Sequence, residues 1–233
     1  MFGPGALGAL EAPALTGPLV DGAGLLSPAE RAQTEAFLLD FDGKTEAQIV
    51  VLTVPSLEGD DIDAFSMRVF DAWELGEKGR DSGALLVVCA AERKVAIKTG
   101  YGVEGYLTDA KCGLIIREAI APAFRRGAYG EGIYAAVRDM AGFMLNDESL
   151  VSRAVGEGAE DAAGLADVLI IPIIIVFFVL LIVFGRGGGR GRGGRSFGGG
   201  GGGFSGGGGF GSSGGGFSGG GGRSGGGGAK GGW

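Results

Sequence analysis

A run of 17 residues without a charged side chain, residues 168–184, divides this chain into two unlike parts. At about 1.5 Å per residue, a helix of that length reaches roughly 26 Å, close to the ~30 Å hydrocarbon core of a bilayer. Residues 185–233 follow it and hold 31 of the 53 glycines, so they offer little apolar surface to cover a buried helix. The run therefore predicts one transmembrane helix over residues 165–184, with a buried core helix or strand as the alternative.

Charge is divided at the same place. All 27 acidic residues lie at or before Asp167, so residues 1–167 carry a net charge of −13 and the remainder carries +6. Arginines follow the apolar run directly, and the positive-inside rule then places the tail in the cytoplasm and residues 1–164 outside. These arginines are Arg186, Arg190, Arg192 and Arg195.

Three further segments have compositions that do not predict a folded core. Residues 1–18 are expected to be disordered or the remnant of a signal peptide, with small residues around Ala12 as the cleavage region. Residues 146–164 are small, acidic and aperiodic, and are expected to be a linker. Residues 185–233 predict a disordered Gly-rich tail. Their Arg-Gly stretch resembles nucleic-acid-binding segments, but we favour contact with anionic lipid and no nucleic acid.

The absence of histidine limits the chemistry of the remaining residues. No Ser–His–Asp or Cys–His catalysis and no histidine metal ligand can form. The two cysteines, Cys89 and Cys112, are too few for a disulfide framework or a four-cysteine zinc site. We expect Cys89 to behave as a small hydrophobe, and the sequence does not say whether the two pair. Any chemistry must rest on carboxylates, Lys and Arg, hydroxyls or the backbone.

Residues 19–145 predict one folded domain. Ser27, Pro28 and Glu30 indicate a capped helix start, and runs of β-branched and apolar residues indicate strands. The expected order is α-β-α-β-β-α-α, which implies a parallel crossover followed by a hairpin. The fold class is therefore α/β, a three-layer α/β/α sandwich with a mixed sheet. The expected helices are 27–39, 60–76, 108–119 and 131–145, and the expected strands are 46–54, 83–91 and 95–99.

The predicted hairpin brings acidic residues to one end of the sheet. Asp81 precedes one arm and should lie beside the loop that leaves the other arm, which carries Tyr101, Glu104 and Asp109. Carboxylates with nearby backbone carbonyls suit a hard cation such as Ca²⁺ or Mg²⁺, and two carboxylates could also serve acid–base chemistry. The alternative is that Asp109 or its neighbour caps a helix and Asp81 closes a turn.

Two other groups of residues have simpler interpretations. Residues 100–105 match G-x-G-x-x-G, but they follow the second arm of a hairpin, so Gly100 and Gly102 are expected to permit a tight loop and not to bind a dinucleotide. Asp60, Asp61 and Asp63 should lie at the opposite end of the sheet, where capping and solvation explain them.

The order and spacing of several motifs resemble the TPM domain family over about residues 19–145. The layout of domain, apolar span and Gly/Ser/Phe tail ending in Trp233 is similar to YgcG-type bacterial members. The motifs are Val20-Asp21-x-Ala23-Gly24-Leu25-Leu26-Ser27, Gly59-x-x-Ile62, Trp73-x-x-Gly76, Asp81-Ser82-Gly83-Ala84-Leu85-Leu86, Gly100-Tyr101-Gly102-x-Glu104-Gly105 and Leu107-Thr108-Asp109.

The resemblance implies an α/β/α sandwich and acidic positions that bind a divalent cation in some members. Those positions fall on Asp21, Asp81 and Asp109, beside a ligand loop of Gly100, Tyr101, Gly102 and Glu104. Plant relatives in the thylakoid lumen are linked to photosystem II repair and have been called acid phosphatases. We expect a single-pass accessory protein of the bacterial plasma membrane that acts on envelope or membrane proteins. The alternative is a metal-assisted phosphomonoesterase using Asp81 and Asp109.

Overall fold

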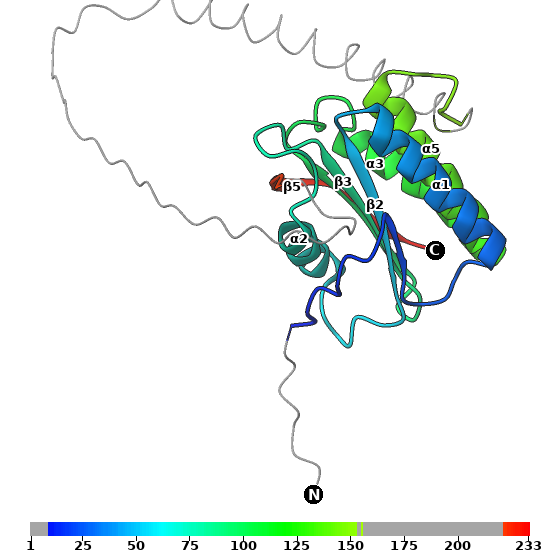
Figure 1. Cartoon of the computed structure of the whole chain (residues 1–233). Helices are drawn as coiled ribbons and strands as arrows, with labels where there is room; N and C mark the ends of the chain where they lie inside the picture. The colour runs from blue at the N-terminus through cyan, green and yellow to red at the C-terminus, as the bar shows by residue number, and fades with distance from the viewer. Residues whose placement is uncertain (1–8, 153–154, 156–220) are drawn as a thin grey trace, which may run out of the picture. The chain divides into compact units, whose positions relative to one another are not determined.

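The computed structural model describes residues 9–152, residue 155 and residues 221–233 (Figure 1). The predicted membrane span and most of the tail lie outside these residues. Within the described part, no helix has both the length and the apolar character needed to cross a bilayer.

A five-stranded mixed sheet organises the domain, in the order β1-β2-β3-β4-β5. The first three strands are parallel, whereas β4 runs antiparallel to both β3 and β5. Every residue of β2 and β3 is buried, as expected of continuous apolar strands covered on both faces. The strands are β1 Leu19–Asp21, β2 Gln48–Val54, β3 Gly83–Cys89, β4 Lys94–Gly100 and β5 Ser224–Gly232.

Helices cover both faces of this sheet. Figure 1 shows α2 on one side, and α1, α3 and α5 on the other, and each side encloses its own buried apolar cluster. The capping box predicted at Ser27 and Glu30 is present. The helix expected over 108–119 continues further, as α3, the π-helical η1 and α4. The helices are α1 Pro28–Lys44, α2 Ile62–Trp73, α3 Asp109–Leu114, η1 Ile115–Ile120, α4 Ala121–Arg125 and α5 Tyr129–Leu145.

The α/β fold and the mixed sheet are confirmed. The β2-α2-β3 unit is the expected parallel crossover, and β3 and β4 form the expected hairpin. The short edge strand β1 was not predicted, because three residues are too few to show a periodic pattern.

The prediction of a disordered tail is wrong for its last residues. Strand β5 comes from the Gly-rich tail and pairs with β4 from Lys94 opposite Gly232 to Gly100 opposite Ser224. The tail has few large side chains and therefore cannot form a core of its own. It does not need one here, because the edge of an existing sheet offers hydrogen-bonding partners to any backbone that fits. Glycine fits here because it has no Cβ: Gly228 has a φ of +124°, and a Cβ on it would clash with the Ile97 carbonyl oxygen.

The domain also extends beyond the predicted limits of 19–145. After α5, the Ser152 N–H donates to Asp139 Oδ1 at 2.5 Å, and Val155 is buried, so the first part of the expected linker is folded. At the other end, Leu10, Ala12 and Leu15 pack against the apolar cluster beneath α2. The segment predicted as a signal-peptide remnant or disordered thus contributes to the domain from residue 10 onward.

A carboxylate that accepts several hydrogen bonds makes the stability of the domain depend on pH. The Cys89 thiol first, then the Ser56 hydroxyl and the Leu57 N–H, donate to Glu92 and lower its pKa from 4.5 to about 2. Since the folded-state pKa is the lower one, Glu92 stabilises the fold above about pH 4.5, and this contribution is lost as the pH falls toward 2.

We therefore expect Glu92→Gln to lower the melting temperature at pH 7 by a few degrees and to flatten its pH dependence between pH 4.5 and 2.5. Circular dichroism melts at a series of pH values measure both effects. The matched control is Glu58→Gln, on the loop that follows β2. Equal pH profiles for Glu92→Gln and the unaltered protein would contradict this assignment.

Candidate strand-binding site

Asp81 lies where the hairpin geometry predicted. Its carbonyl oxygen accepts the Gly102 N–H at 3.0 Å, so it lies beside the loop that leaves β4. The residue has a φ of +51°, a conformation that Asp adopts more readily than most residues. Its side chain reaches the tail instead of closing its own turn: Asp81 Oδ1 accepts the Arg223 N–H at 2.8 Å.

Asp109 has the same kind of partner. Thr108 is the N-cap of α3, because its hydroxyl accepts the Lys111 N–H at 3.4 Å. Asp109 is therefore not needed as the cap, and its Oδ1 accepts the Gly228 N–H at 2.7 Å. Two of the three acids that were predicted to bind a cation, Asp81 and Asp109, thus bind the main chain of the tail.

The predicted ligand loop also contacts this segment. Gly100 pairs with Ser224 in the sheet, and the Tyr101 N–H donates to the Arg223 carbonyl oxygen at 3.3 Å. A Cβ on Gly227 would lie 2.5 Å from Glu104 Oε1, so that carboxylate is directly against the strand. Within the described structure, the ligand that this loop holds is a glycine-rich strand of the same chain.

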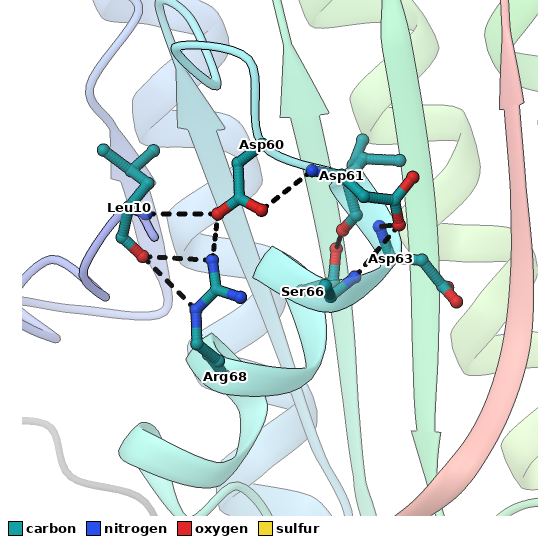
Figure 2. Close-up of polar contacts among 8 residues, drawn as sticks. Leu10, Asp60, Asp61, Asp63, Ser66 and Arg68 are labelled. Atoms are coloured by element: carbon teal, nitrogen blue, oxygen red, sulfur yellow. Dashed lines mark hydrogen bonds and ion pairs between the residues drawn. The ribbon is translucent and has the colours of Figure 1, made fainter. Parts of the chain in front are cut away.

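Acidic side chains at the start of α2 approach lysines of β4 and β5, on the side of the sheet that α2 covers. Asp63 Oδ1 lies 2.5 Å from the ammonium of Lys98, which is only 4% exposed. The same acid and Asp61 lie 3.9 and 3.6 Å from the ammonium of Lys230 on β5. Asp61 is the expected helix cap (Figure 2). Asp63 is not explained by solvation alone, because it pairs with Lys98.

Figure 2 also shows how the start of α2 is fixed. Asp60 accepts the Leu10 N–H at 3.1 Å and the Asp61 N–H at 2.8 Å, and it forms an ion pair with Arg68. The Arg68 guanidinium also donates to the Leu10 carbonyl oxygen at 3.2 Å. The N-terminal segment therefore holds the end of α2 that presents Asp61 and Asp63 to the tail.

Trp233 packs against two aromatic side chains of the domain. The Trp233 ring lies 4.7 Å from the Phe124 ring and 6.2 Å from the Tyr129 ring, centroid to centroid, with edge-to-face geometry in both pairs. Such pairs stabilise contacts beyond simple burial. The sequence analysis did not predict these ring contacts or the roles of Lys98 and Lys230, although a tryptophan after a long glycine run was a usable signal.

Asp21, the third acid that the resemblance suggested, lies elsewhere. Asp21 lies opposite Thr53 of β2. The end of the sheet near Asp81 lies at the level of Gln48 on the same strand, which is opposite Gly83. Five residues of strand separate the two levels, about 16 Å. The Asp21 carboxylate accepts the Leu25 and Leu26 N–H groups at 3.0 and 3.1 Å.

The described residues therefore do not fit a bound cation as they lie. No group of three or more Cys, Asp or Glu side chains within this part of the chain could hold a metal ion. Asp81 and Asp109 hold points of the tail that are five residues apart, and each carboxylate already accepts a main-chain N–H.

The two cysteines belong to different sides of the sheet. Cys89 lies in the apolar cluster under α2 and Cys112 in the cluster on the opposite face. Both thiols are free, and the sheet between them prevents a disulfide. Burial raises the pKa of both thiols, to about 12 for Cys112, so neither position suggests a reactive thiolate.

The Asp109 contact yields a direct test of the site. We expect Asp109→Ala to speed hydrogen exchange at the Gly228 amide roughly fivefold, since a net hydrogen bond contributes about 1 kcal/mol. Exchange measured by NMR should change little at amides of β2. Asp40→Ala, on the exposed side of α1, is the control. Unchanged exchange at Gly228 would show that the carboxylate does not hold the strand.

Comparison with known proteins agrees with this fold. A model of the TPM domain matches residues 19–143. Among solved structures, the chain is similar to the N-terminal domain of a protein from P. gingivalis, with 33% identity and a TM-score of 0.51, covering 58% of this chain and 85% of that one. The BA42 protein from the psychrophilic bacterium Bizionia argentinensis has 17% identity and a TM-score of 0.45, covering 54% and 83%. A search of curated proteins found no match. Because the family match covers more than half of its length, the chain belongs to the TPM domain family.

Proposed function

We propose that this chain is a membrane-attached accessory protein with a YgcG-type layout, and that its domain binds extended polypeptide instead of catalysing hydrolysis. One observation carries the proposal: Asp81 and Asp109, the best candidates for a catalytic or metal-binding pair, accept main-chain N–H groups of a glycine-rich strand. Recognition of a strand at a sheet edge draws its affinity from main-chain hydrogen bonds and its specificity from side-chain pockets.

The chemistry of the chain favours binding over phosphoester hydrolysis. With no histidine, a hydrolase would need its carboxylates free to act as acid and base. Here Asp81 and Asp109 each accept a main-chain N–H of the tail. The sequence also has neither a P-loop nor a Cys-x5-Arg phosphate cradle. The partners that we propose are envelope or membrane proteins that present an extended segment.

Attachment to the bacterial plasma membrane is proposed from residues 165–184, with the domain outside. Its support is the length of the uncharged run and the positive charge that follows it. The expected cytoplasmic location of the tail is harder to reconcile with β5. A single crossing would separate the tail from the domain with which it pairs.

A phosphatase assay separates the binding protein from the alternative enzyme. We expect the purified full-length chain to show no phosphomonoesterase activity with p-nitrophenyl phosphate, with or without EDTA, at pH 5 and pH 7. Asp109→Asn and the surface control Asp40→Asn should behave alike. Activity that EDTA abolishes, and that Asp109→Asn removes while Asp40→Asn does not, would overturn the proposal in favour of the hydrolase.

Binding of Ca²⁺ or Mg²⁺ by Asp81 and Asp109 stays a prediction, and we expect it only when β5 has left the sheet edge. Without the tail N–H groups, a cation would relieve repulsion between these acids and Glu104. A ligand that binds only the folded state stabilises it by about 2.7 kcal/mol at 100 times its Kd.

Millimolar Ca²⁺ or Mg²⁺ should therefore raise the melting temperature of a chain truncated after residue 220 more than that of the full chain. Asp81→Asn or Asp109→Asn should lessen the rise. Asp40→Asn is the control. Asp63→Asn would not serve, because Asp63 pairs with Lys98 and its substitution would disturb that ion pair. Melting curves of the truncated chain that are indifferent to both cations and to EDTA would remove cations from the proposal.

A further inference from the structure

We infer that residues 221–233 are a resident ligand of the domain in the full-length chain, bound to the outer edge of β4, and that they lie on the same side of the membrane as the domain. The inference rests on the proposed function only for the attachment to a membrane. The domain and these residues form one compact unit.

Glycine is required along the strand for reasons of space. A Cβ on Gly222 would clash with the Leu75 carbonyl oxygen, one on Gly228 with that of Ile97, and one on Gly231 would lie 2.8 Å from Ile116 Cγ2. Real Cβ atoms do not approach other atoms so closely, and Gly228 also has a positive φ. The edge therefore selects a glycine-rich strand and rejects ordinary β sequences.

Polar groups of the domain hold the main chain of the strand. Asp81 accepts the Arg223 N–H and Asp109 the Gly228 N–H, at 2.8 and 2.7 Å. Upstream of the strand, the Gly221 N–H donates to the Glu74 carbonyl oxygen at 2.7 Å. These donors are main-chain groups, so they hold the path of the strand, and the crowded glycine positions decide which residue lies where. A segment shifted by one residue would place a different residue at each crowded position.

Trp233 closes the far end of the site. Its ring contacts Phe124 and Tyr129, which belong to α4 and α5. Lys230, three residues before it, approaches Asp61 and Asp63 on the opposite face. The segment thus has an aromatic anchor on one face and a basic anchor on the other, which a strand selected only for edge pairing would not need.

The two buried apolar clusters of the domain are built from residues outside this strand. Neither buried apolar cluster includes a residue of 221–233, and only Ala229 and Trp233 pack partly against one of them. Loss of the segment would expose the β4 edge and leave both clusters in place. This is the behaviour of a bound ligand and not of a structural element on which the fold depends.

The position of the segment constrains membrane topology. Val155 and Gly221 both belong to the domain unit, so the 65 residues between them begin and end on its side. A crossing helix takes about 20 predominantly apolar residues, and the sequence between them holds one such run, residues 168–184. We therefore expect this run to enter the bilayer without carrying the tail to the other side. A single crossing would instead place residues 221–233 out of reach of β4.

A cysteine pair in the full-length chain tests the inference. Ala96 and Lys230 lie directly opposite each other on β4 and β5, and opposed residues of antiparallel strands have Cα atoms about 4.5–5.5 Å apart, within disulfide range. We expect Ala96→Cys with Lys230→Cys to form an intramolecular cystine under mild oxidation of intact bacterial cells, seen as a reducible increase in gel mobility.

Two matched variants show whether that cystine depends on the site. Lys44→Cys, at the exposed end of α1, should not pair with Lys230→Cys. Adding Gly228→Val to the Ala96–Lys230 cysteine pair should reduce the cystine at least fivefold. A disulfide-linked dimer would mean that a second copy supplies the strand, and an absent cystine would mean that the site is empty. Either result overturns the inference.

The side of the membrane is measured separately with a membrane-impermeant maleimide on intact cells. Ser212→Cys in the tail and Lys44→Cys in the domain should be labelled equally, since the native thiols are buried. Labelling of Ser212→Cys only after lysis, with Lys44→Cys labelled before it, overturns the inference. Fractionation of the same cells tests membrane attachment separately. If the chain is absent from membranes and still forms the cystine, the proposed attachment is wrong and the binding of residues 221–233 to β4 stands.

Discussion

The outer edge of β4 is the constraint on which the candidate site depends. A strand at the end of a sheet presents a row of main-chain N–H and C=O groups that pair with any suitable backbone. Here β3 fills one side of β4, and β5 fills the other over Ser224–Gly232. The loop after β4, the start of α3 and the turn at Asp81 all lie beside this edge, and their polar groups are directed to the strand that covers it.

Electrostatics supports the same arrangement. Residues 1–167 carry a net charge of −13 and the remainder carries +6, so the tail approaches a domain of opposite sign. Long-range attraction of this kind raises encounter rates more than affinity. Affinity must come from close contacts, since Lys230 lies 3.6 and 3.9 Å from the acids of α2 and is half exposed, and exposed ion pairs contribute little.

Much of the fold could be predicted from the sequence, because its signals are local. The box at Ser27 and Glu30, the helical stripe of α2 and the apolar runs of β2 and β3 each determine their own structure. Hairpin geometry even placed Asp81 beside the loop after β4. The ligand was missed because β5 has no intrinsic strand signal: its conformation is imposed by a partner more than 120 residues earlier in the chain. Asp21 was misplaced because a family motif gives positions along the chain and not distances in space.

Glycine gives this strand a particular balance of energies. Glycine loses more conformational freedom on ordering than any other residue, so every residue fixed in β5 opposes docking. Yet backbone atoms crowd Gly222 and Gly228 so closely that no other residue fits there. The strand therefore depends on its pairing with β4, the carboxylate bonds and the Trp233 ring to offset a large entropic cost. Docking in this balance is specific without being tight, so a partner strand that offers the same glycine pattern can compete for the β4 edge.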